Sequence, residues 1–152
     1  MQKIKNKLGF TLIEILLVIG IIAILAAVVI VAINPSRQFA QARNAQRSSN
    51  VETILNGIYQ YATSNTGSLP TAVVTGSCST AANEVCKTGG TCTGITDLSV
   101  LTVSETYLVS MPFDPTTATT NGTGYFAFKS ANGRVTVCAP GAELSATISV
   151  TR

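Results

Sequence analysis

The sequence predicts an α+β fold in which a long N-terminal helix, membrane-spanning in its first half, packs on a small antiparallel sheet held by disulfides. Residues 10–33 form an almost unbroken apolar run. Over residues 51–62 apolar side chains recur at three- and four-residue steps, the spacing of one helix face. Two alternating segments flank Asn132-Gly133, a pair that favours a hairpin turn. At 152 residues the chain is long enough for one domain and short for two.

The apolar run predicts a membrane helix, because about 20 apolar residues cross the ~30 Å hydrocarbon core. It is interrupted only by Thr11, Glu14 and Gly20. Three lysines precede it and three arginines follow it, so the positive-inside rule gives a nearly balanced count: Lys3, Lys5, Lys7, Arg37, Arg43 and Arg47. The cysteines favour an oxidising compartment, so we place the N-terminus in the cytoplasm and the C-terminal part outside.

Three interpretations compete for this segment: a plain anchor, a secretory signal peptide cut near Ala32, and a short leader cut after Gly9. A signal peptide would have a shorter apolar region and no glutamate. An ionised Glu14 in a membrane helix costs about 2.5–3.5 kcal/mol, which a simple anchor has no reason to keep. Cleavage after Gly9 supplies a reason, since it creates an amine at Phe10, one helical turn from the carboxylate. The amine of one copy could then neutralise Glu14 of its neighbour and fix the axial register.

The segment KNKLGFTLIEILLVIGIIAIL resembles the N-terminus of type IV pilins and of type II secretion pseudopilins. In that family a basic leader ends in Gly, cleavage precedes Phe, and Glu is the fifth mature residue. Gly9, Phe10 and Glu14 occupy those positions here, with the common Thr11 and Leu12 between them. The resemblance implies a prepilin peptidase that cuts after Gly9 and N-methylates Phe10. It also implies an assembly ATPase and a platform protein as partners, and a pilin-like head.

These observations divide the chain into a leader at residues 1–9, a transmembrane or filament-core helix at 10–34, an amphipathic continuation at 35–66 and a globular head at 67–152. Pro35 predicts either a kinked continuous helix or a break with a new cap. Gly20 and Pro35 are the expected points of helix flexibility. The arginines at 37, 43 and 47 would form a solvated face, contact anionic headgroups or pair between subunits.

The continuation should pack on the sheet through a stripe of apolar residues: Val51, Ile54, Leu55, Ile58, Tyr61 and Ala62. Residues 71–95 predict a disulfide-tethered loop, and residues 97–109 suit either a short helix or a strand. The clearest strands are in residues 124–138, a hairpin in which Phe126 and Phe128 would share a face with Val135 and Val137. Residues 144–150 predict a last strand.

The four cysteines, an even number, predict two disulfides: Cys78, Cys86, Cys92 and Cys138. Three pairings are open, and we favour Cys78–Cys86 as a local loop with Cys92–Cys138 as the long-range link. A zinc site is disfavoured because the spacing lacks a C-x2-C pair and the chain has no histidine.

The sequence predicts no enzyme, cofactor or bound metal. Without histidine there is no Ser-His-Asp or Cys-His arrangement, and no glycine pair is followed by the lysine of a phosphate loop. The segment YLVSMPFDP resembles part of pilin and pseudopilin heads more loosely, but the acidic calcium loop of many pseudopilins is missing. Asn121-Gly122-Thr123 fits a glycosylation sequon, although a simple turn explains it as well.

The net charge of +3 comes from the three leader lysines, and the remaining seven basic residues balance seven acidic ones. A neutral mature chain has no overall attraction to nucleic acid. We therefore predict a structural subunit of a homo-oligomeric, extracellular type IV pilus-like filament, made as a single-pass inner-membrane precursor. The alternatives are a type II secretion pseudopilin and a membrane-anchored binding module that never assembles. The residues do not select among adhesion, motility, DNA uptake and secretion.

Overall fold

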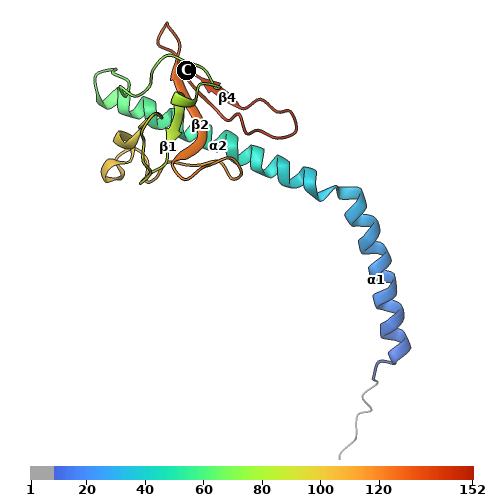
Figure 1. Ribbon diagram of the computed structural model, residues 1–152. Helices are drawn as coiled ribbons and strands as arrows, with labels where there is room; N and C mark the ends of the chain where they lie inside the picture. The colour runs from blue at the N-terminus through green and yellow to red at the C-terminus, as the bar shows by residue number, and fades with distance from the viewer. Residues whose placement is uncertain (1–8) are drawn as a thin grey trace, which may run out of the picture. The chain divides into compact units, whose positions relative to one another are not determined.

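A computed structural model describes residues 9–152, so residues 1–8 of the predicted leader lie outside the described part of the chain. The chain divides into two compact units between Gln38 and Phe39. We call residues 39–152 the head unit. The described elements run from two long helices into a small sheet interrupted by short 3-10 turns (Figure 1). The predicted α+β class is confirmed.

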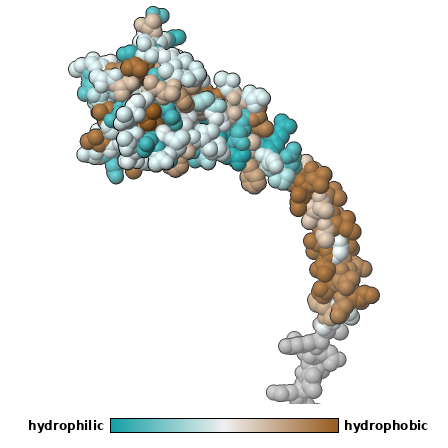
Figure 2. Space-filling view, viewed as in Figure 1, coloured by the Kyte–Doolittle hydropathy of each residue, from teal (hydrophilic) through white to brown (hydrophobic). Residues whose placement is uncertain are grey.

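Helix α1, Leu12–Ile33, is apolar on every side and has no buried residue. Figure 2 shows it as a continuous hydrophobic surface, in contrast to the mixed surface of the head unit. Of the described helices it alone is long and apolar enough to cross a membrane. A helix that is hydrophobic all round must be covered by lipid or by other protein.

Asn34 separates α1 from α2, Pro35–Ser64, so the second of the two expectations at Pro35, a break with a new cap, is correct. Asn34 adopts a left-handed backbone conformation, with φ 49°, that ends α1. Its side-chain oxygen accepts a hydrogen bond from the Arg37 amide at 3.4 Å. Pro35 follows as the first residue of α2, where its missing N–H costs nothing.

The predicted apolar stripe of α2 faces the core. Tyr61 is partly buried against this core. The other five members are buried: Val51, Ile54, Leu55, Ile58 and Ala62. The stripe packs against the sheet residues Tyr125, Ala127, Val135 and Val137 and against Leu98 and Leu101 of the connecting segment.

The sheet has four antiparallel strands in the order β1-β2-β3-β4. Their bounds are Glu84–Cys86 (β1), Gly122–Lys129 (β2), Val135–Cys138 (β3) and Ser149–Thr151 (β4). Short 3-10 turns occupy Ala81–Asn83 (η1), Ser99–Leu101 (η2) and Val103–Glu105 (η3). The uncertain segment 97–109 is therefore neither a strand nor a regular α-helix, and β1 lies in the region predicted as a loop.

The β2–β3 hairpin forms where predicted, but its predicted facing is wrong. Lys129 pairs with Val135, so residues 130–134 make a five-residue connection in place of a tight two-residue turn. This change shifts the register by one residue, and a one-residue shift exchanges the faces of a strand. Ala127 thus lies opposite Val137 in the core, whereas Phe126 and Phe128 lie opposite Cys138 and Thr136 on the other face.

The predicted disulfide pairing is also wrong. The bonds are Cys78–Cys138 and Cys86–Cys92, with Cα–Cα distances of 6.2 and 5.5 Å. After β1 the chain turns back, with Gly90 N–H donating to Lys87 C=O at 3.0 Å, and this returns Cys92 to Cys86. The segment before Cys78 is anchored at the far end of β2, where the Lys129 amide donates to the Val74 carbonyl at 2.9 Å.

The last strand is shorter than predicted and starts later, at Ser149. Leu144 and Ser145 have φ angles of 57° and 56°, which a strand cannot contain. The preceding residue, Glu143, is bound to α2 by the ion pairs described below. Residues 139–148 therefore form a loop attached to the helix.

Candidate functional site

The start of α1 holds the predicted cleavage and assembly residues in one short segment. Gly9 and Phe10 are exposed and lie outside the helix. Thr11 caps it, since its hydroxyl accepts a hydrogen bond from Glu14 N–H at 3.3 Å. In return the Glu14 carboxylate accepts from the Thr11 amide at 3.5 Å and from the Thr11 hydroxyl at 3.4 Å. Such a reciprocal capping box stops a helix from extending toward the N-terminus.

The capping box has two consequences for the chemistry of this segment. The Gly9–Phe10 peptide bond stays in non-helical, exposed backbone, the form in which a peptide bond is accessible to a protease. The Glu14 carboxylate is held one turn from Phe10 by the first turn of the helix. Its negative charge also lies at the positive end of the helix dipole, where it is favourable.

Comparison with protein-family models gives a match at this same segment. The model described as the prokaryotic N-terminal methylation motif matches residues 4–30. The chain carries a type IV pilin-like methylation motif. The match supports a precursor of the pilin or pseudopilin type. No curated protein and no solved structure matched the chain.

The methylation motif extends through most of α1 and includes Gly20 but not Pro35. An added Cβ at Gly20 would meet no atom within 4 Å, so the glycine relieves no crowding within the described chain. Pro35 lies at the start of α2, beyond the motif. The predicted flexibility of both positions remains a prediction.

A second cluster, which sequence reasoning missed, lies inside the head unit. Arg47 is fully buried, and its guanidinium donates to both carboxylate oxygens of Asp114, at 2.6 and 3.1 Å. Arg47 also donates to Glu143 at 2.8 Å. Arg43 binds Glu143 with two further bonds, at 2.6 and 2.7 Å. We call these four residues the ion cluster.

The ion cluster perturbs its own carboxylates. Burial alone would raise the pKa of Asp114, but hydrogen bonds from Arg47 and from the amides of Thr116 and Thr117 outweigh it and hold that pKa well below its ordinary value. Hydrogen bonds from Arg43 and then Arg47 lower the pKa of Glu143 to about 2. Hydrogen bonding to Asp114 raises the pKa of Arg47, so the guanidinium is always charged.

The ion cluster corrects the expectation for the arginines of α2. Arg43 and Arg47 do not form a face of free, solvated cations, because they pair within the chain with carboxylates 67 to 100 residues away. Arg37 is exposed, and its predicted alternatives stay open. The pairing could not be predicted because the partners are far apart in sequence. Two features pointed toward it: Arg43 and Arg47 share one helix face, and the head contains few acids.

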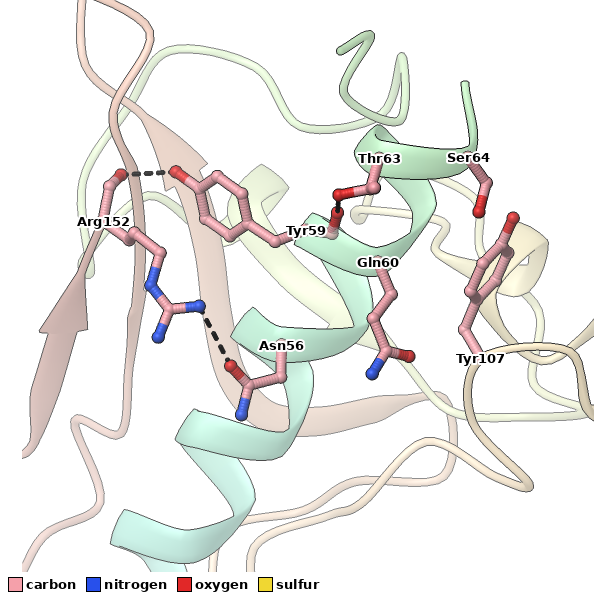
Figure 3. A pocket seen from close by; sticks show the side chains of 7 residues that line it. All are labelled: Asn56, Tyr59, Gln60, Thr63, Ser64, Tyr107 and Arg152. Atoms are coloured by element: carbon pink, nitrogen blue, oxygen red, sulfur yellow. Dashed lines mark hydrogen bonds between the residues drawn. The ribbon is translucent and has the colours of Figure 1, made fainter. Parts of the chain in front are cut away.

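The outer side of α2 borders an open groove of about 520 Å³ (Figure 3). Tyr59 donates its hydroxyl to the Arg152 carbonyl at 2.5 Å, and the Arg152 guanidinium donates to the Asn56 side chain at 3.1 Å. Gln60 and Tyr107 line the other side. Its lining side chains include one cation, Arg152, and no carboxylate.

Proposed function

We propose that this protein is a structural subunit of a type IV pilus-like extracellular filament. Its precursor is a single-pass protein of the inner membrane, with the N-terminus in the cytoplasm. A prepilin peptidase hydrolyses the Gly9–Phe10 amide, which leaves a carboxylate on Gly9 and an amine on Phe10. The amine then receives one methyl group from a methyl donor.

A single observation carries this proposal: Glu14 lies in an otherwise uncharged apolar helix, one turn from the residue that would become the new N-terminus. In the precursor the carboxylate is bound by Thr11. After cleavage the Phe10 amine offers a stronger, cationic donor, and in a filament the amine of a neighbouring copy can supply it. Any other stagger of two apolar helices would leave a buried charge unpaired, so the pair sets the axial register.

The apolar surface of α1 points in the same direction. None of its 22 residues is buried, and the side chains that a bilayer covers before assembly can pack against the same helix of other copies afterwards. Other copies of this chain are therefore the proposed partners, and the resemblance of the N-terminus implies a prepilin peptidase and an assembly platform with its ATPase as well. The ion cluster favours a pilus subunit over a calcium-binding pseudopilin, because Asp114 and Glu143 are bound by arginines.

The proposal is tested by replacing Glu14→Leu in the full chain and counting filaments sheared from cells. The variant should still insert in the membrane but should yield almost no filaments, because register is lost. Glu105→Leu, at an exposed acid of the head, is the matched control and should assemble normally. Mass spectrometry of the wild-type protein should give a chain that starts with N-methylated Phe10. An intact Met1, or undiminished filaments from Glu14→Leu, would instead favour a non-assembling anchored module.

A further inference from the structure

Two large apolar side chains stay exposed at the end of the head unit that follows the apolar helix in sequence. Phe39 is 64 % exposed and Leu144 is 52 % exposed. Phe39 and Arg43 are one turn apart on the same face of α2. The Arg43 guanidinium binds Glu143, and the Asn44 side chain binds the amide and carbonyl of Glu143 at 2.9 and 2.8 Å. Leu144, the next residue, is therefore held beside the turn of α2 that follows Phe39.

Leu144 combines this exposure with an unusual backbone conformation. Its φ of 57°, followed by 56° at Ser145, lies in the left-handed region, which costs a residue with a Cβ roughly 1–2 kcal/mol. Glycine or asparagine would fit this turn more easily. The chain instead keeps a large apolar side chain there, directed to the outside and fixed by the ion cluster.

Chain connectivity limits how far Phe39 can be from a bilayer. It lies six positions after Ile33, the last residue of α1. Six positions span about 9 Å as a helix and at most about 20 Å when extended. The headgroup layer adds roughly 5–7 Å to each side of the hydrocarbon core. Whatever direction α2 takes, Phe39 stays near the membrane surface.

We propose that Phe39 and Leu144 form a lipid-contacting patch through which the head rests on the bilayer before assembly. Phenylalanine and leucine on one face insert at the boundary of headgroups and acyl chains. The ion cluster beside them contains two cations and two anions, so contact with lipid leaves no unpaired charge. Zwitterionic lipid is therefore sufficient. The proposal rests on the membrane anchoring by α1 that is part of the proposed function.

The absence of tryptophan from the sequence makes a clean test possible. Phe39→Trp and Leu144→Trp would each be placed singly in the full chain and reconstituted in phosphatidylcholine vesicles. Bromines attached to the acyl chains close to the headgroup quench only a tryptophan that enters this layer. Both variants should show blue-shifted emission and should lose most of it in brominated vesicles. The result for Leu144→Trp decides whether the patch exists, because Leu144 is far from α1 in sequence and reaches the bilayer only through the folded head.

Two control positions separate failure of the patch from failure of the anchoring. The first control is Val103→Trp. Val103 belongs to the loop that places Leu108 against Gly57. Gly57 is 18 residues along α2 from Phe39, a distance of about 27 Å. Val103→Trp should therefore stay unquenched. Ile24→Trp lies within α1 and should be quenched by bromines placed deep in the acyl chains. An unquenched Ile24→Trp would overturn the anchoring and the patch together.

A combined variant tests the contacts that hold the loop. Glu143→Ala and Asn44→Ala, combined with Leu144→Trp, remove the side-chain bonds that hold the loop to α2, so the quenching should fall toward the value of Val103→Trp. One result would overturn the patch alone: Ile24→Trp is quenched, but Leu144→Trp is quenched no more strongly than Val103→Trp. A blue shift of Leu144→Trp that appears only in filaments would do the same, and would assign this face to contact between copies.

Discussion

Helix α1 and the head unit satisfy their side chains in opposite ways. None of the 22 residues of α1 is buried within the described chain, and its one acid is bound by a residue three positions away. The head buries an apolar core together with a charged arginine, whose partners lie 67 and 96 residues further along the sequence. Local sequence therefore determines α1, whereas the head depends on contacts that only the folded chain creates. Three experiments test that difference.

The largest effect is expected from the long-range disulfide. Cys78 and Cys138 are 60 residues apart, and Cys86 and Cys92 only 6. In the chain-entropy view, closing the longer loop stabilises the head by about 4 kcal/mol and the shorter one by about 2 kcal/mol. Replacing both cysteines of each pair by serine should therefore lower the free energy of unfolding about twice as much for Cys78–Cys138. Denaturant unfolding of the full chain in detergent, followed by circular dichroism, measures both.

The two disulfide variants serve as controls for each other, since each removes one bond and adds two hydroxyls. Equal losses of stability would contradict the contrast between local and long-range links. Retained helix signal from α1 in both variants would show that the detergent-covered helix does not depend on the head.

The next effect is expected from Asp114→Ala. It leaves Arg47 buried without its main partner, and breaking a buried pair in this way costs about 3–5 kcal/mol. We expect the lower end of that range, because Glu143 still binds the same guanidinium. Asp97→Ala is the matched control: its carboxylate is exposed and accepts one hydrogen bond, from the Ser99 amide. The same unfolding assay should show little change for the control, and similar losses for both variants would argue against the ion cluster.

The sequence predicted the features that depend on neighbouring residues. The apolar run and the buried stripe of α2 follow from spacing alone, and Asn132-Gly133 correctly marks a hairpin. The errors all concern distance in sequence or loop length. One extra residue in register moved Phe126 and Phe128 off the core face. The cysteine pairing depends on which strand ends lie together, which composition does not encode.

The candidate site shows the same division. Gly9, Phe10 and Glu14 are recognisable because a charge in an apolar run is unusual wherever it occurs. The pairing of Arg47 with Asp114 cannot be recognised in this way, because arginine in the polar half of a helix is common. Glu143 gave no local signal of its own, since it lies just before residues whose alternation predicted a strand.

The smallest effect is expected from mild acid. Both carboxylates of the ion cluster have folded-state pKa values below their ordinary ones, about 2 for Glu143. Groups of this kind stabilise the folded state at pH values above their unfolded pKa, near 4, and lose that contribution as the pH falls through the folded pKa. Stability of the head should therefore be constant from pH 7 to about pH 5 and should decline steadily from there toward pH 2.

Glu143→Gln tests whether the ion cluster causes that decline. Glutamine keeps the shape of the side chain but cannot titrate, so the variant should be less stable at pH 7 and should lose less stability between pH 5 and pH 3. Glu105→Gln, at an exposed acid outside the ion cluster, should follow the wild-type curve. If Glu143→Gln also followed that curve, the acid sensitivity would belong to other carboxylates. The loop that carries Leu144 would then be held by the Asn44 hydrogen bonds, which do not titrate.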